Sequence, residues 1–212
     1  CPDTDGDGDA ELFAGNVCPS YSGWLPWSTL RMTEPVDAAG ENLWYVIQPT
    51  LRDHTTAEPI NSDTAGALSV DAVNDVVAVI IAPGPALVGQ VNRPSNAIGD
   101  YLEGENANGD NVFTLNPVNL LEVPNTLGND SLVYITRQEL MGMVEKRVIS
   151  EVNTAMNTYR NSTAPGAFPW LSPFDSPTAS AFRGAVNTRQ GHVPFHWSGD
   201  TDSINLGGAV NG

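Results

Sequence analysis

Acidic residues occupy every second position from residue 3 to residue 11, and this feature constrains the chain most strongly. Like charges so close together repel one another unless a positive group holds them, and a hard cation bound by oxygen ligands is the usual partner. Glycines at positions 6 and 8 let the backbone curl, so that alternate side chains can converge on one point. The segment therefore predicts a structural calcium (Ca2+) loop with the ligands Asp3, Asp5, Asp7, Asp9 and Glu11.

This loop is not a regular EF-hand. The pattern Asp-x-Asp-x-Asp-Gly from residue 3 fits the first half of that motif, but its twelfth position, normally a bidentate glutamate, is Ala14. A shorter calcium loop is the interpretation we favour. An acidic turn without a metal is the alternative, because Asp–Gly repeats form turns on their own.

Two cysteines, Cys1 and Cys18, flank the acidic segment. An even pair favours one disulfide in a protein of an oxidising compartment, and closing a loop of this size stabilises a fold by roughly 3 kcal/mol. Two alternatives stay open. In the first, Cys1 is the lipid-modified first residue of a lipoprotein and Cys18 is a free thiol. In the second, the two cysteines are half of a zinc site, although no histidine lies near them in the sequence.

Charge narrows the class of protein. The 212 residues carry 25 Asp and Glu against 9 Lys and Arg, a formal net charge of −16. Nucleic acids and anionic membrane surfaces require basic patches, so neither is an expected partner. The composition fits an extracytoplasmic protein of the cell surface or periplasm, or a secreted one. No apolar run is long enough to span a bilayer, and we expect a membrane or targeting segment to be missing from the N-terminus.

Apolar patterning predicts an α+β fold. Residues 76–82 form the most apolar run, which indicates a central strand buried on both faces. The other expected strands are residues 43–48, 67–70, 112–115 and 131–135. We therefore expect an antiparallel sheet of four to five strands, with many loops and one long helix packed on it.

That helix is expected over residues 136–160. Thr136 and Glu139 have the spacing of a capping box. Apolar residues then recur at steps of three or four and form one stripe, which we expect to pack on the sheet: Leu140, Val144, Val148, Val152, Ala155 and Tyr159.

Two domains are expected, residues 1–135 and residues 136–212. The second contains the helix and a loop-rich tail in which Gly-x-x-Pro-aromatic segments, at residues 166–170 and 191–195, echo residues 23–27. A duplicated helix-plus-hook module would explain the echo, and chance similarity in a chain rich in Pro and Trp is the alternative.

The order of motifs resembles bacterial prepilin-like proteins related to type IV pilins and type II secretion pseudopilins. The resemblance covers about the first 135 residues and is carried by segments 1–8, 23–30, 37–46, 79–90 and 100–106. Segment 37–43 is similar to a degenerate form of the Asp-Pro-Trp-Gly-Asn-Pro-Tyr turn of major pseudopilins. The tail from residue 136 departs from the simple pilin pattern.

The resemblance implies a pilin-like globular domain that serves as a structural subunit of a surface filament or a secretion pseudopilus. Its partners would be other pilin or pseudopilin subunits, and it would contact a membrane only through the missing N-terminal helix. A secreted calcium-dependent adhesin or glycan-binding module is the alternative function.

We expect no enzymatic activity, because the sequence lacks the nucleophile, zinc-protease, phosphate-loop and dinucleotide motifs. His192 and His196, with Asp200 and Asp202 nearby, are a weak metal candidate and are interpreted as loop or packing residues. The five tryptophans are interpreted as packing residues rather than as a sugar platform: Trp24, Trp27, Trp44, Trp170 and Trp197.

Overall fold

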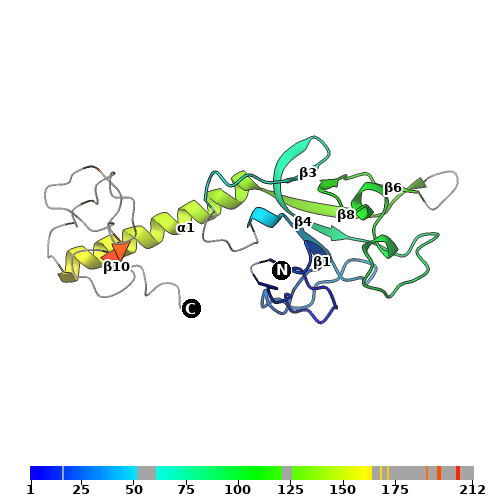
Figure 1. Ribbon diagram of the computed structural model, residues 1–212, viewed down its shortest axis with the longest axis horizontal. Helices are drawn as coiled ribbons and strands as arrows, with labels where there is room; N and C mark the ends of the chain where they lie inside the picture. The colour runs from blue at the N-terminus through cyan, green and yellow to red at the C-terminus, as the bar shows by residue number, and fades with distance from the viewer. Residues whose placement is uncertain are drawn as a thin grey trace. The chain divides into compact units, whose positions relative to one another are not determined.

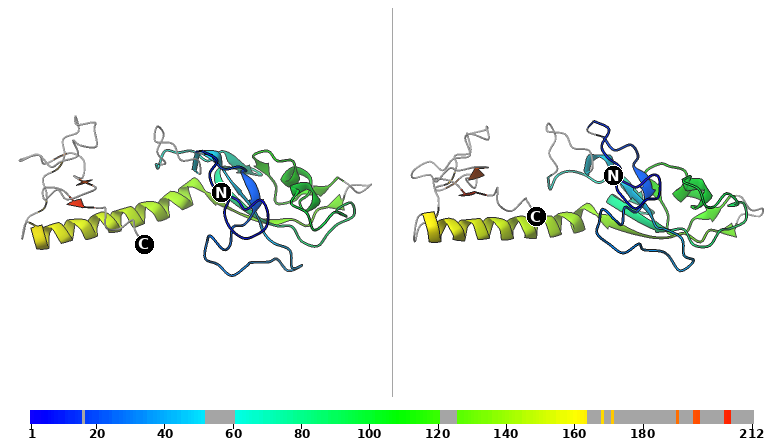
Figure 2. Two further views of the ribbon diagram at one scale, coloured as in Figure 1. Left: turned by 60° about the horizontal axis from the view of Figure 1, so that its bottom comes forward. Right: turned by 90° about the horizontal axis from the view of Figure 1, so that it is seen from below.

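The computed structural model describes residues 1–15, 17–51, 61–120 and 126–163, together with isolated positions further along the chain. Its contacts divide the chain into two units, Cys1–Met141 and Gly142–Gly212, where the sequence analysis expected a boundary after residue 135. The first unit contains the main sheet. Helix α1 (Arg137–Thr158) begins in the first unit and continues into the second (Figures 1 and 2).

The first unit is built on a six-stranded sheet with β4 (Val73–Ala82) at its centre. Strand β4 pairs antiparallel with three strands, β2 (Trp44–Ile47), β3 (Leu68–Val70) and β8 (Ser131–Thr136). Strand β1 (Ser22–Trp24) pairs antiparallel with β2.

The expectation of a purely antiparallel sheet is wrong at one pair. Strand β5 (Val112–Phe113) lies parallel to β3, so the sheet is mixed. Between the two strands the chain runs back along β4 and then crosses over through the 83–111 segment, and parallel pairing requires such a long connection. The α+β class itself is correct.

Short elements complete the described part of the chain. Two strand pairs lie outside the main sheet: the antiparallel pair β6 (Val118–Asn119) and β7 (Thr126–Leu127), and the parallel pair β9 (Phe195–His196) and β10 (Ile204–Asn205). The short helical elements are the 3-10 turns η1 (Pro49–Leu51), η2 (Ile98–Asp100) and η3 (Gly104–Ala107). A π-helical turn, Tyr159–Thr163, follows α1.

The apolar run of β4 forms the middle of the core, as its sequence predicts. Residues 76–79 are all buried, so the strand is covered on both faces there, and Val76 and Val79 have no exposed surface. Strand β2 instead alternates buried and half-buried residues, which is the period expected of a strand with one covered face.

Three aromatic rings pack against one another in this core. The ring of Trp24 lies 4.2 Å from that of Trp44 and meets Tyr101 edge to face at 4.8 Å. The packing interpretation is confirmed for Trp24 and Trp44, which are both buried. Trp27 is half-buried, and Trp170 and Trp197 lie outside the described residues.

Helix α1 begins at the predicted capping box. The Thr136 backbone N–H donates to Glu139 Oε2 at 2.9 Å, and the Glu139 N–H donates back to Thr136 Oγ1 at 3.3 Å. The bond from the Thr136 N–H holds the pKa of Glu139 below its usual value. The expected helix is therefore present, and its bounds agree closely with residues 136–160.

The expected packing of the helix stripe on the sheet is wrong. Val144 and Val148 are 42% and 54% exposed, and Met141 is the residue of α1 that is buried. Two physical reasons account for this. No loop residues separate β8 from α1, and the core beside β4 is already filled by Tyr101 and other side chains from loops. The other stripe residues are half-buried: Leu140, Val152, Ala155 and Tyr159.

Candidate functional site

The N-terminal acidic loop is organised around the buried carboxylate of Asp3, which is 1% exposed. Its Oδ1 accepts the backbone N–H of Gly6 at 2.7 Å and of Asp5 at 3.1 Å, and its Oδ2 accepts the N–H of Gly8 at 2.7 Å. The Asp3 backbone exchanges two hydrogen bonds with Trp24, which attaches the loop to β1. Three N–H dipoles thus stabilise the buried charge and fix the curl of the loop.

Gly8 is required for this curl. Its φ of +88° lies in the left-handed region, and a Cβ at this position would fall 2.4 Å from the indole ring of Trp27. The chain also contains the Cys1–Cys18 disulfide that the sequence analysis expected, with Cα atoms 5.5 Å apart. The loop is therefore held at both ends and packed against an aromatic ring in its middle.

Three of the five predicted calcium ligands converge. Carboxylate oxygens of Asp3, Asp5 and Glu11 all lie within 4.8 Å of one another. The Glu11 side chain is positioned by Thr4, whose backbone N–H donates to Oε1 at 3.1 Å and whose hydroxyl donates to the same oxygen. Three carboxylates supply part of the six to eight oxygens that calcium takes, and carbonyls and water usually supply the rest. The donor set therefore fits a hard divalent cation.

The other two predicted ligands, Asp7 and Asp9, do not belong to this cluster. Both are exposed. The Asp7 Oδ1 accepts the Asp9 N–H at 2.8 Å, which is a local turn bond, and the Asp9 carboxylate faces the Thr29 hydroxyl at 3.5 Å. These two aspartates therefore form the acidic turn that was the alternative interpretation of the segment.

A cleft of about 790 Å³ adjoins the acidic loop. It is bounded by three segments that are distant in sequence: the loop, the 34–42 turn and the 94–101 segment. Three carboxylates from two of them, Asp5, Glu34 and Glu41, line it beside the edges of Trp24 and Tyr101. Such a cleft has a negative potential and favours a cation or a ligand rich in hydrogen-bond donors.

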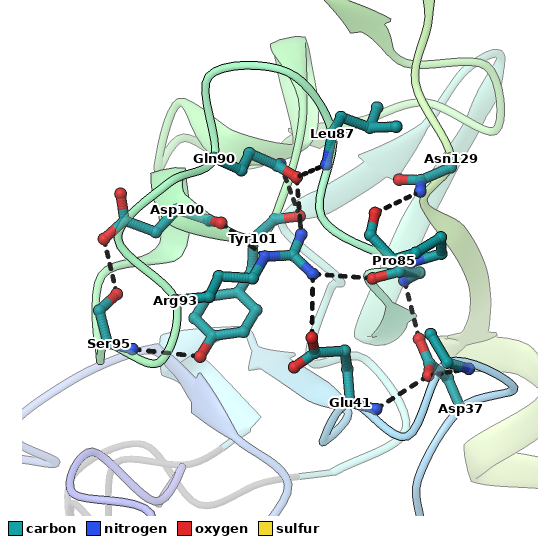
Figure 3. Close-up of polar contacts among 12 residues, drawn as sticks. Asp37, Glu41, Pro85, Leu87, Gln90, Arg93, Ser95, Asp100, Tyr101 and Asn129 are labelled. Atoms are coloured by element: carbon teal, nitrogen blue, oxygen red, sulfur yellow. Dashed lines mark hydrogen bonds and ion pairs between the residues drawn. The ribbon is translucent and has the colours of Figure 1, made fainter.

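Arg93, which sequence reasoning missed, fixes one wall of this cleft (Figure 3). Its side chain is 7% exposed and donates at 2.8 Å to the carbonyls of Gly84, Asp100 and Tyr101. The guanidinium also lies 4.6 Å from the centre of the Tyr101 ring and 3.4 Å from Glu41 Oε1. An arginine in a chain with so few basic residues was the available signal. The Arg93 side chain binds the 83–101 segment to the core.

Asp37 connects the same wall to the 37–41 turn. Its Oδ1 accepts the N–H groups of Ala39 and Glu41, and its Oδ2 accepts the Gly84 N–H at 2.7 Å. Figure 3 shows this carboxylate between the 37–41 turn and the 84–87 segment. Asp37 is therefore a positioning residue for a structural turn.

A second acidic pair, Glu103 and Asp130, lies inside the fold rather than at the cleft. The two residues are 3% and 7% exposed. Nothing in the sequence indicates that Asp130, 27 positions away from Glu103, would contact it. Burial raises the pKa of Asp130 to about 8.

No family model, curated protein or solved structure matches this chain. Among the helices of the described residues, none is long and apolar enough to cross a membrane. Of the weak metal candidate in the C-terminal tail, His192, Asp200 and Asp202 lie outside the described residues, and His196 is described only as part of β9. Most of the Gly-x-x-Pro-aromatic segments at residues 166–170 and 191–195 also lie outside them.

Proposed function

We propose that this chain is the globular part of an extracytoplasmic pilin- or pseudopilin-like structural subunit, stabilised by a calcium ion in its N-terminal loop and acting by assembly rather than by catalysis. The observation that carries the proposal is the row of apolar side chains exposed on α1. Met143, Val144, Val148 and Ile149 are between 42% and 68% exposed.

Exposed apolar side chains grouped on one helix are typical of a surface that a partner covers. On α1 they span nearly two helical turns, and Val144 and Val148 are neighbours on the same face because they are four residues apart. In a structural subunit, the partner of such a face is another subunit of the assembly. Glu145, Lys146 and Arg147 lie between the two apolar pairs and supply charges that would border the contact.

The acidic loop supports the extracytoplasmic part of the proposal. Disulfides persist in oxidising compartments, and calcium at the concentrations found outside the cytosol can occupy sites of modest affinity. A stapled loop whose buried carboxylate is already satisfied by backbone N–H groups is a stabilising device. Nothing in its geometry requires a reacting substrate.

Self-association of the chain tests the proposal. Val148→Asp together with Ile149→Asp should weaken association at high protein concentration, as measured by sedimentation velocity, because charges would enter the apolar contact. Val91→Asp is the matched control, since Val91 is 83% exposed on a loop outside α1. Equal sedimentation of parent and double variant at every concentration would contradict assembly through α1.

The acidic cleft favours one other function, the calcium-dependent adhesin or glycan-binding module. Asp5 belongs to both the carboxylate cluster and the cleft lining, so a cation held by the cluster would lie close to a ligand in the cleft. Calcium-dependent retention on immobilised glycans, lost in Glu34→Gln, would favour this function over assembly.

A further inference from the structure

Glu103 and Asp130 form a reciprocal pair in the interior. The Glu103 backbone N–H donates to Asp130 Oδ2 at 3.0 Å, and the Asp130 backbone N–H donates to Glu103 Oε2 at 3.2 Å. Each carboxyl group therefore binds the backbone of the other residue. The pair joins the start of η3 to the segment that leads into β8, two parts of the fold that are distant in sequence.

Hydrogen-bond donors are distributed unequally over the two carboxyl groups. Glu103 receives three: Gln90 Nε2 on Oε1 at 2.7 Å, and the N–H groups of Asn129 and Asp130 on Oε2. On Asp130, both donors lie on Oδ2, the second being Asn106 Nδ2 at 3.1 Å. Asp130 Oδ1 is buried and has no donor. Both oxygens of Glu103 thus have donors, whereas Asp130 has one oxygen that lacks a partner unless it carries a hydrogen.

Among the residues that the structure describes, none supplies a positive charge to Asp130. Glu103 is the charged group that faces it, from the N-cap of η3, and their side chains are within hydrogen-bonding reach. Asn106 and Asn129 are neutral, and Gln90 is the neutral residue behind Glu103. The guanidinium of Arg93 donates to Gln90 Oε1 at 2.7 Å and has no hydrogen bond or ion pair with either carboxyl group of the pair. Two adjacent buried negative charges without a cation are strongly unfavourable, as in other carboxyl pairs that share a proton.

We propose that this pair is a buried proton-binding site, in which Asp130 Oδ1 carries a single proton at neutral pH and donates it to the Glu103 carboxylate. This hydrogen bond between the two carboxyl groups holds the start of η3 against the segment that leads into β8. Loss of that proton leaves two anions in contact and weakens the closure. The fold is therefore sensitive to pH at a position remote from the acidic loop and from α1, so the inference goes beyond the proposed function.

The sign of the pH effect follows from the pKa of Asp130, which burial raises from 3.8 to about 8. Between these pH values the folded state holds a proton that the unfolded state has lost. The contribution of Asp130 to stability is thus complete below pH 3.8 and is lost as the pH rises toward about 8. The unfolding equilibrium constant should rise by up to about tenfold per pH unit in this window.

Conservative variants distinguish which residue holds the proton. In Asp130→Asn, the amide oxygen can accept the two bonds now made to Oδ2, while the amide NH2 donates to Glu103 in place of the proton. In Glu103→Gln, the amide NH2 would have to face either Gln90 Nε2 or the two backbone N–H groups. These are all donors, so the NH2 would have no acceptor. We therefore expect Asp130→Asn to fold well and Glu103→Gln to be destabilised.

The experiment is urea unfolding of the whole chain from pH 4.5 to pH 8.5, with EDTA present so that calcium binding does not contribute. The ratio of the unfolding constants of parent and Asp130→Asn should change by up to about tenfold per pH unit. Glu105→Gln is the matched control, because it removes a charge from an exposed position of the same turn, and it should keep the pH dependence of the parent.

Infrared spectroscopy of the parent provides a readout that does not depend on a variant folding. A carboxylic acid C=O band should be present at pH 6 and disappear as the pH passes about 8. The proposal is overturned if that band is absent from the folded parent at pH 6, if Asp130→Asn keeps the parent's pH dependence, or if Glu103→Gln is the better tolerated of the two substitutions.

Discussion

Replacement of Arg93 by Met gives a stringent test of the stability argument, because methionine keeps much of the length of the side chain and removes every donor. The carbonyl of Tyr101 would still accept a hydrogen bond from Gln90 Nε2, but the carbonyls of Gly84 and Asp100 would each lose the bond that Arg93 donates. An unsatisfied buried acceptor costs about 1–3 kcal/mol, and because these two carbonyls are only partly buried, each should cost near the lower end of that range. The Glu41 side chain is 31% exposed, so loss of its ion pair with Arg93 should add less than about 1 kcal/mol. We therefore expect Arg93→Met to lower the free energy of unfolding by about 3 kcal/mol.

Urea unfolding followed by tryptophan fluorescence measures this loss, since Trp24 and Trp44 lie in the same core as Tyr101. Arg93→Lys keeps the charge but not the planar fork, so it should fall between the parent and Arg93→Met. Arg147→Met on α1 is the control, because Arg147 is exposed and the two residues have similar helix propensities. A urea midpoint for Arg93→Met equal to that of the parent, with an unchanged slope, would show that these Arg93 contacts do not stabilise the fold.

Two further predictions concern acidic side chains of the first unit. Asp5→Asn with Glu11→Gln should abolish calcium binding in calorimetry, whereas Asp7→Asn with Asp9→Asn should leave it nearly unchanged; the parent should gain roughly 2.7 kcal/mol at a hundredfold excess of calcium over Kd. If the melting temperature of the parent is the same in calcium and in chelator, the loop is only an acidic turn and binds no calcium. Asp75 receives the Gly66 N–H at 2.6 Å and Arg137 Nε at 2.7 Å, and these bonds hold its pKa below 3.8. Stability from Asp75 is thus present above that pH and lost as the pH falls through the lowered pKa, so Asp75→Asn should flatten the acid limb of a stability curve below about pH 4. An acid limb as steep as that of the parent would contradict this.

Much of the local structure was predictable from short-range patterns. The capping box at Thr136 and Glu139 depends on residues three positions apart, and it forms as expected. The apolar run of β4 is long enough to require burial on both faces, whatever the partners are. The acidic loop was recognisable for the same reason, because its charges and glycines are contiguous.

Burial of the helix stripe was not predictable from its period. Recurrence of Val144 and Val148 shows that one face of the helix is apolar, but it does not show what covers that face. The direct connection of β8 to α1 and the loop side chains packed on the core decide that, and neither has a periodic signal. The division of the acidic loop into a cluster of three carboxylates and a turn with two was likewise decided by contacts with Thr4 and Thr29.

Local sequence patterns were sufficient for the elements whose hydrogen bonds and side-chain periods close within a few residues: the main strands, the bounds of α1 and the curled acidic start. The burial of charged groups depends instead on the tertiary structure, since Asp130 contacts Glu103 from 27 positions away and Arg93 contacts Glu41 from 52 positions away. The physical reason is that the free energy of a charge depends on the donors, acceptors and solvent around it in space, and these come from residues that the local sequence does not specify.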